Sequence, residues 1–213
     1  NGVLFTVRSG NLYFVSGTGN DTTGNGSFAT PWLTLLKARA MQVAGDTIYA
    51  MNGSDQKCND GDVFHAAFSV GTTGTLGRTG TASNPVAWIV YPGHTVQIGT
   101  DDAAGDCSAG NPQDVKYAIR TNKTGTRYWT FAGFNLIGGG TLTGNFSAIE
   151  IGGNVTPDSN WRVLGNDITC PKSATSTGCI ASGAEYSDFY GNTIHDMGTD
   201  LTPAARSKLF HSL

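Results

Sequence analysis

The sequence predicts an all-β protein in which short strands stack into a parallel β-helix behind a single α-helix. The first observation is a phrase that occurs three times, in which a glycine ends a short run of aromatic or branched residues. These glycines, Gly133, Gly165 and Gly191, lie 32 and then 26 residues apart. The second observation is an interleaved phrase whose apolar positions are spaced by 30, 31 and 30 residues, at Ile119, Ile149, Ile180 and Phe210. Self-similarity at a fixed period of this size indicates a repeat architecture.

Each repeat has the pattern of β-strands. The repeats are rich in aromatic and β-branched residues, alternate with period two, and are interrupted by Gly-Asn turns, and no helical face recurs. Two or three strands per repeat, stacked about 4.8 Å from the next repeat, form one rung of a β-helix and place like residues on like. We expect two inward-facing core stacks: Ile119, Ile149 and Ile180 on one face, and Phe131, Val163 and Phe189 on another. Asn166 and Asn192 are expected to form a short ladder of hydrogen-bonded amides.

Composition limits the class of protein. The 213 residues include 30 glycines, only 14% are charged, and the net charge is -3 with 13 Lys plus Arg. The sequence shows no basic patch of the kind that nucleic-acid binders carry. It also contains no run of 18 apolar residues, so no membrane span is predicted. We expect a single domain over residues 1–213. Residues 12–45 would form a strand, a turn and a capping helix, and residues 46–213 about five rungs with an open C-terminal end.

One helix is predicted before the repeats. Thr30 is a suitable N-cap and Pro31 suits the first helical position. An apolar stripe follows at helical spacing, and Gly45 suits the end of the helix; the stripe consists of Trp32, Leu35, Leu36, Ala40 and Val43. We expect this helix to cover the first rung, which would otherwise expose backbone groups and an apolar cross-section.

Four cysteines suggest disulfides. Cys170 and Cys179 bracket a polar loop between two predicted strands, and Cys58 and Cys107 both lie in loops and would pair by default. Four cysteines allow three connectivities, so other pairings stay open. Zinc is a weaker alternative because no Cys-x-x-Cys occurs. Disulfides and several Asn-x-Ser/Thr sequons together favour a secreted or cell-surface protein.

Three N-terminal phrases carry a family resemblance. They are Tyr13-Phe-Val-Ser-Gly-Thr-Gly-Asn-Asp, Ala29-Thr-Pro-Trp-Leu-Thr-Leu-Leu-Lys-Ala and Ala44-Gly-Asp-Thr-Ile-Tyr. They resemble the opening of secreted right-handed parallel β-helix proteins of the pectate-lyase-like superfamily, especially polysaccharide-lyase relatives. The later phrases Gly165-Asn-Asp-Ile and Gly191-Asn-Thr-Ile-His-Asp resemble its rung consensus. The resemblance implies a right-handed coil and a polysaccharide partner, but the fold hosts lyases, hydrolases, epimerases and inert rods.

Chemistry on such a fold requires polar side chains on an outward face. A lyase needs a base, usually Lys or Arg, and carboxylates that hold calcium, whereas a hydrolase needs two or three carboxylates. If the Ile stack faces inward, Arg120 and Glu150 point outward as neighbours, followed by His211 if the register holds. Arg162 and Asp188 are a similar pair on another face and are candidates for substrate binding. Each pair has a structural alternative, an exposed salt bridge.

His195 and Asp196 form the most suggestive pair, because a His beside an Asp, followed by Asp200, is a candidate acid/base cluster. The alternative is a structural turn. A calcium site is considered at Asp101, Asp102 and Asp106, which crowd one loop, with a solvated loop as the alternative. Asp60 and Asp62 favour a turn over calcium because the rest of a calcium loop is missing.

The C-terminal residues 207–213 resemble the start of another rung. We therefore expect the natural protein to continue, or another chain to stack on this end. Two functions stay open. The leading one is a polysaccharide lyase acting on a polyuronide, with a glycoside hydrolase as second choice of enzyme, and the other is a non-catalytic rod that binds glycan or builds a surface or filament.

Overall fold

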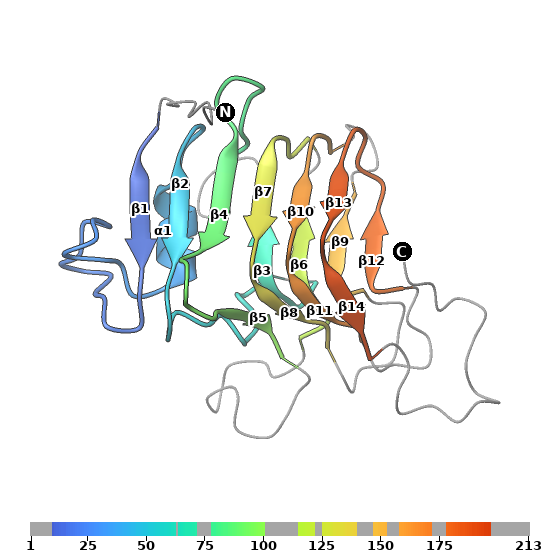
Figure 1. The fold of residues 1–213 in the computed structure, drawn as a ribbon, viewed down its shortest axis with the longest axis horizontal. Coiled ribbons are helices and arrows are strands. Elements are labelled where there is room, and N and C mark those ends of the chain that lie inside the picture. The colour runs from blue at the N-terminus through green and yellow to red at the C-terminus, as the bar shows by residue number, and fades with distance from the viewer. Residues whose placement is uncertain are drawn as a thin grey trace, which may run out of the picture.

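The fold is a set of parallel sheets with one short helix. The structure is a computed structural model, and it describes residues 10–62, 64–71, 78–100, 115–121, 125–139, 147–152, 158–171 and 178–196. Within these ranges the chain forms fourteen strands in three parallel sheets (Figure 1). This arrangement is mostly β, as the sequence predicts, and it is consistent with a parallel β-helix.

The largest sheet has six strands. Its order is β1-β2-β4-β7-β10-β13, and each neighbouring pair is parallel. The strands are β1 (Leu12–Val15), β2 (Thr47–Ala50), β4 (Val86–Val90), β7 (Trp129–Ala132), β10 (Arg162–Leu164) and β13 (Asp188–Tyr190). Figure 1 shows them side by side in chain order.

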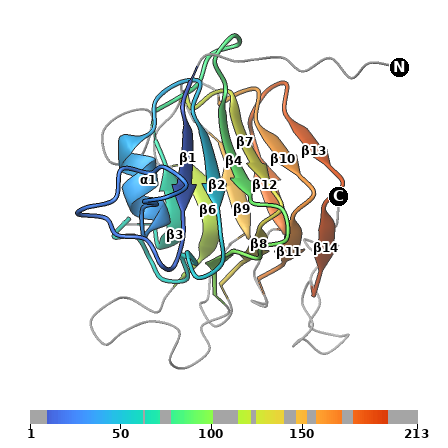
Figure 2. The same ribbon diagram turned by 60° about the vertical axis from the view of Figure 1, so that its left-hand side comes forward.

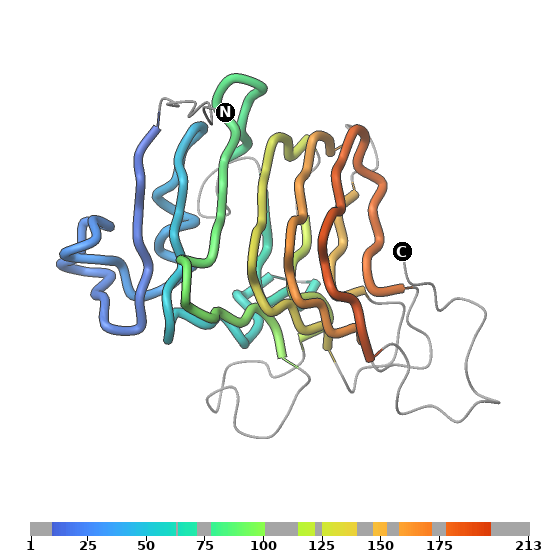
Figure 3. Tube along the Cα trace, in the orientation of Figure 1, coloured from blue at the N-terminus to red at the C-terminus, as the bar shows by residue number. Residues whose placement is uncertain are grey.

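Two four-stranded sheets complete the structure. The β5 sheet contains β5 (Gln97–Gly99), β8 (Asn135–Ile137), β11 (Asp167–Thr169) and β14 (Thr193–His195). The β3 sheet contains β3 (Ala66–Val70), β6 (Tyr117–Thr121), β9 (Ile149–Ile151) and β12 (Ile180–Ser182). From β4 onward the chain contributes one strand to the six-stranded sheet, one to the β5 sheet and one to the β3 sheet, and then returns (Figure 3).

The register confirms the predicted stacks. Phe131 pairs with Val163, which pairs with Phe189. In the β3 sheet, Ile149 lies between Ile119 and Ile180. Phe210, the fourth expected member, lies outside the described residues. The repeat spacing in the sequence therefore corresponds to lateral pairing between strands.

Flat aromatic rings fill the interior behind the six-stranded sheet. Trp88, Trp129 and Trp161 are almost parallel to their neighbours, with ring centroids 6.5 Å and 5.9 Å apart, and all three are fully buried. Phe131 stacks against Trp129 and Trp161 at 5.9 Å and 6.0 Å. The spacing between strands brings these rings into contact, and burial of their faces supplies the hydrophobic stabilisation of the core.

The predicted asparagine ladder forms at the turn between β10 and β11. Asn166 Nδ2 donates to Asn192 Oδ1 at 3.0 Å and to the carbonyl of Phe131 at 3.2 Å. Asn166 Oδ1 accepts the backbone N–H of Phe134 at 2.9 Å, and Asn192 Nδ2 donates to the carbonyl of Val163 at 2.8 Å. The amides thus satisfy backbone groups of the preceding repeats, namely the carbonyls of Phe131 and Val163 and the N–H of Phe134.

The helix begins later than the sequence predicts. Helix α1 covers Leu35–Met41, its N-cap is Thr34, and its C-cap is Gln42. Thr30 and Pro31 are therefore not the start of the helix, and Gly45 is not its end. The reason lies in Trp32, whose backbone N–H donates to Phe14 and whose carbonyl accepts from Ser16, so that this segment bonds to β1.

Loops and helix α1 cover the first strand of each sheet. Backbone groups of Gly26 and Trp32 bond to β1, and Gln56 bonds to β5. Arg39 from α1 donates to the carbonyl of Ser69 in β3 at 2.7 Å and pairs with Asp60, which accepts the N–H of Ser69. Helix α1 lies beside β1 and β3 (Figure 2) and so shares the predicted capping role with two loops. The single-domain boundaries remain a prediction.

Candidate functional site

The predicted site residues lie on three different sheets. Arg162 and Asp188 begin β10 and β13 of the six-stranded sheet, and Arg120 and Glu150 belong to β6 and β9 of the β3 sheet. His195 ends β14 of the β5 sheet. Each pair is formed as the register predicts. In the part of the chain that the structure describes, no hydrogen bond or ion pair joins one pair to another, so we treat them as separate sites.

A cleft lies over β7, β10 and β13 on the outer face of the six-stranded sheet. Its volume is ≈ 230 Å³, and it is lined by Ala82, Pro85, Tyr128, Thr130, Asn160, Arg162, Tyr186 and Asp188. Thr130 pairs with Arg162, and Arg162 with Asp188, so these side chains form one row across three strands. The residues two positions earlier form a second row. The sequence predicted the Arg162–Asp188 pair of the first row but not the cleft.

The second row has an unusual backbone. Tyr128, Asn160 and Tyr186 have φ of 55°, 56° and 52°, in the left-handed region that non-glycine residues rarely adopt. Backbone hydrogen bonds between neighbouring repeats hold this bend. For example, the N–H of Tyr128 donates to the carbonyl of Ser159 at 3.1 Å. Such a conformation costs of order 1 kcal/mol per residue or more. Its repetition just before β7, β10 and β13 places two tyrosines and an amide at one edge of the cleft.

The Arg162–Asp188 pair leaves most of the guanidinium available. Arg162 Nε donates to Asp188 Oδ2 at 3.2 Å, and the side chains are 55% and 62% exposed. Within the described residues, the two terminal nitrogens of Arg162 donate no hydrogen bond. An exposed pair of this kind contributes under about 1 kcal/mol to stability. It can therefore exchange its partner for a ligand at little cost.

The Arg120–Glu150 pair is packed far more tightly. Nε of Arg120 lies 3.0 Å from Glu150 Oε1, and its guanidinium lies 3.7 Å from the centroid of the Phe64 ring and 5.3 Å from that of Tyr117. Only 16% of the Arg120 side chain is exposed. Burial and the adjacent Glu150 carboxylate raise the pKa of Tyr117 to about 12. Protein groups thus surround this guanidinium, which leaves little of it for a substrate.

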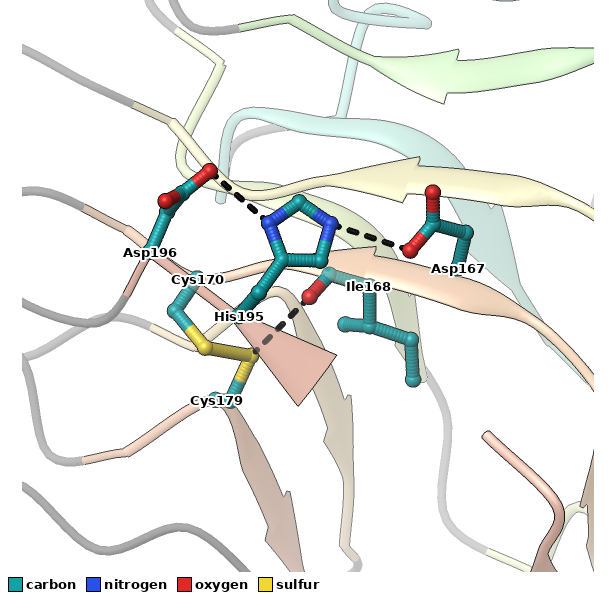
Figure 4. The surroundings of a disulfide bond; sticks show 6 residues. All are labelled: Asp167, Ile168, Cys170, Cys179, His195 and Asp196. Carbon is teal, nitrogen blue, oxygen red and sulfur yellow. Dashed lines mark hydrogen bonds and ion pairs between the residues drawn. A yellow bond between two sulfur atoms is a disulfide. The ribbon is translucent and has the colours of Figure 1, made fainter. Parts of the chain in front are cut away.

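His195 is held between two carboxylates (Figure 4). Its Nδ1 lies 2.8 Å from Asp196 Oδ2 and its Nε2 lies 2.9 Å from Asp167 Oδ1. The hydrogen bond to Asp196 is the largest influence on the pKa of His195 and raises it; burial opposes this rise, but the charge and hydrogen bond of Asp167 add to it, so the pKa is raised. An imidazole that donates from both nitrogens is protonated, so this cluster favours proton donation over proton abstraction.

Asp167 was missed in the sequence. It pairs with Thr193, whereas His195 pairs with Thr169. Residues 167 and 169 face the same side of β11, so Asp167 is the diagonal neighbour of His195 across the strand pair. The aligned phrases Gly165-Asn-Asp-Ile and Gly191-Asn-Thr-Ile-His contain this signal. Asp200, the carboxylate first considered, lies outside the described residues.

The disulfide prediction is confirmed for one pair. Cys170 and Cys179 form a disulfide with Cα atoms 4.7 Å apart, beside His195 (Figure 4). Cys58 is also disulfide-bonded, and Cys107, its expected partner, lies outside the described residues. Disulfide-bonded sulfurs at Cys58, Cys170 and Cys179 are not available as zinc ligands. The disulfide fits an extracellular protein.

The remaining predictions concern metal and further ligands. Asp101, Asp102, Asp106 and His211 lie outside the described residues. Within the described ranges, no three His, Cys, Asp or Glu side chains are grouped so that they could hold a metal ion. Asp60 pairs with Arg39 and Ser69, which is a structural role. Among the described residues, no helix is sufficiently long and apolar to cross a membrane.

Comparison with known proteins gives one match. No protein-family model matches the sequence, and no curated protein matches it. A solved structure titled "Rhamnogalacturonan lyase" is 15% identical, with a TM-score of 0.49, over 86% of this chain and 51% of that chain. This chain therefore spans about half the length of the one that it matches. At this similarity the match assigns neither family nor activity.

Proposed function

We propose that this protein is a secreted, right-handed parallel β-helix that binds an acidic polysaccharide in the cleft over β7, β10 and β13. One observation carries the proposal: the cleft combines two tyrosines with an arginine whose terminal nitrogens have no partner among the described residues. Sugar chains present apolar C–H faces and many hydroxyls, and polyuronides add a carboxylate on each unit. The cleft offers a complementary group for each of these features.

The roles follow from the chemistry of each side chain. Tyr128 and Tyr186 supply ring faces for the sugar, together with hydroxyls. The terminal nitrogens of Arg162 match the geometry of a carboxylate, and the Asp188 carboxylate orients the guanidinium from Nε. Thr130 and Asn160 supply further hydrogen-bonding groups. The combination of exposed aromatic and charged groups suits recognition of a long, hydrated polymer.

A polysaccharide lyase is the second candidate, and His195 favours it. A lyase removes a proton beside the uronate carboxylate and expels the glycosidic oxygen, which must then gain a proton. His195 lies between the carboxylates of Asp167 and Asp196, is 38% exposed, and in its protonated form has the chemistry of that proton donor. Arg120 and Glu150 would serve such an enzyme only if their packing opened. Calcium bound near Asp101, Asp102 and Asp106 would neutralise the uronate.

The test measures binding and turnover separately. Retardation in native gels containing polygalacturonate or alginate reports binding, and we expect Arg162→Ala to weaken it at least tenfold, as loss of a charged hydrogen bond of about 1.5–3 kcal/mol implies. We expect a similar loss for Tyr186→Ala. Met41→Ala is the control, because Met41 is 50% exposed on α1 and does not line the cleft.

Three results would decide against the proposal. Equal retardation of the wild type and the Arg162→Ala variant by every acidic polymer would exclude the cleft as the binding site. Ultraviolet absorbance of an unsaturated product that is lost in His195→Ala but retained in Arg162→Ala would make the lyase the better description. Reducing ends without that absorbance would indicate a hydrolase.

A further inference from the structure

A second group of aromatic side chains lies on the outer face of the six-stranded sheet, away from the cleft. Phe14 and Tyr49 belong to β1 and β2, Tyr91 follows β4, and Phe28 comes from the loop before α1. We call these four residues the aromatic patch. The patch lies at the C-terminal ends of β1, β2 and β4, whereas the cleft lies at the N-terminal ends of β7, β10 and β13. The two sites are therefore distinct.

The rings of the patch contact one another continuously. Phe14 and Tyr49 are paired in register and stack with centroids 5.6 Å apart at 21°. Tyr91 meets the edge of Tyr49 at 5.5 Å, and Phe28 meets Phe14 at 5.2 Å and Tyr91 at 6.1 Å. These contacts hold the rings in a fixed arrangement, so binding of a ligand would cost little side-chain conformational entropy.

The patch is a surface feature and not part of the core. The neighbouring residues in the strands, Val15, Ile48 and Ala50, are fully buried and belong to the core, whereas the four patch residues do not. Phe14, Tyr49 and Tyr91 are half-buried, and Phe28 is 60% exposed. Exposure of so large an apolar ring, supported from below by three others, is typical of a binding surface.

The rim of the patch carries polar groups. His94 meets the edge of the Tyr91 ring at 5.4 Å, and its Nδ1 lies 3.0 Å from the backbone nitrogen of Asn52. Nδ1 of His94 accepts the N–H of Asn52, so the ring proton is on Nε2. The Nε2–H group is therefore a further hydrogen-bond donor at the rim. The hydroxyls of Tyr49 and Tyr91 add to it. In the part of the chain that the structure describes, no Asp, Glu, Lys or Arg takes part in the ring contacts of the patch.

We propose that the aromatic patch binds an uncharged polysaccharide, whose sugar rings stack on Phe28 and the rings beneath it. Its chemistry differs from that of the cleft, because it offers ring faces, hydroxyls and an imidazole, and among the described residues no Arg or Lys side chain contacts its rings. The proposal goes beyond the cleft and does not depend on it. A protein carrying both sites would hold a neutral polymer at one end of the sheet and an acidic polymer at the other.

The test uses soluble uncharged polymers as probes, namely a β-glucan, a xylan and a galactomannan, with polygalacturonate as the acidic reference. We expect Phe28→Ala to weaken retardation by at least one uncharged polymer about tenfold, which corresponds to about 1.4 kcal/mol. Leu12→Ala is the matched control, because Leu12 is also 60% exposed and lies in β1 beside the patch but has no ring. Thermal unfolding of each variant checks that the fold is retained.

The outcomes separate this proposal from the cleft. Loss of neutral-polymer binding in Phe28→Ala, with polygalacturonate retardation unchanged, supports the patch. Absence of binding to all three neutral polymers, or equal losses in Phe28→Ala and Leu12→Ala, overturns it without touching the acidic site. A sedimentation coefficient that rises with protein concentration in the wild type but not in Phe28→Ala also overturns it, because the patch would then pair with a second copy.

Discussion

The two faces of the six-stranded sheet carry aromatic stacks of similar geometry but opposite exposure. On the inner face, Trp129 and Trp161 are 5.9 Å apart at 13° and fully buried. On the outer face, Phe14 and Tyr49 are 5.6 Å apart at 21° and half-buried. Both stacks arise because parallel strands about 4.8 Å apart bring equivalent side chains together. Strand pairing therefore produces an aromatic stack on either face. Burial decides whether that stack stabilises the fold or remains available to a ligand.

Truncation of an inner ring is the strongest test of this comparison. We expect Trp129→Ala to lower the free energy of unfolding by about 3–5 kcal/mol, because it removes a fully buried ring and leaves a cavity. Phe14→Ala on the outer face should cost about 1 kcal/mol. Urea unfolding followed by circular dichroism measures both. Similar losses at the two positions would show that the outer stack is structural.

A conservative substitution of Trp129 separates the effect of ring stacking from that of ring size. The indole N–H of Trp129 is buried and has no hydrogen-bond partner among the residues that the structure describes. Trp129→Phe keeps a stacked ring and removes that unsatisfied donor, so its cost should fall well below that of Trp129→Ala. A loss as large as that of the alanine variant would mean that ring size, and not stacking itself, dominates the inner face.

The asparagine ladder gives the intermediate effect. Asn166 is buried and bonds to the N–H of Phe134 and the carbonyl of Phe131. Asn166→Ala should destabilise by about 1–3 kcal/mol, since it leaves these buried backbone groups without partners. Asn192→Ala, at the more exposed end of the ladder, should cost less. Chemical unfolding of the two variants measures the difference, and a reversed order would contradict the ladder as an inward-facing polar stack.

The smallest effect concerns His195 on the outward side of the β5 sheet. Its pKa is raised in the folded protein by Asp196 and Asp167, so its contribution to stability is fully present below the unfolded pKa of about 6.5. The contribution is lost as the pH rises through the higher folded pKa. Because the imidazole is 38% exposed, we expect less than about 1 kcal/mol.

An NMR titration of the His195 ring measures this pKa directly. Asp196→Asn should lower it, and His195→Gln should reduce the loss of stability as the pH rises above about 6.5. A pKa at or below the ordinary histidine value would contradict the ion-paired cluster and would weaken the case for His195 as a proton donor.

Local spacing in the sequence predicted the parts of the fold that repeat. The partners of Ile149 and Val163, the Asn166–Asn192 ladder and the Arg162–Asp188 pair all follow from aligning one phrase on the next. The reason is that lateral pairing between parallel strands turns sequence period into spatial contact. The Cys170–Cys179 disulfide is similarly local, since it closes a short loop between two predicted strands.

Tertiary structure alone decided the features that depend on segments outside the repeat. Trp32 suits a helix by its local sequence, but hydrogen bonds to β1 draw it into a bridge and delay the helix to Leu35. The aromatic patch likewise needs Phe28, which a loop brings onto β1 from outside the strand pattern. The spacing of the repeats in the sequence thus determined which residues lie next to each other on neighbouring strands. Non-local hydrogen bonds and burial decided where the helix begins and which aromatic rings meet solvent, because both depend on contacts that no repeat spacing encodes.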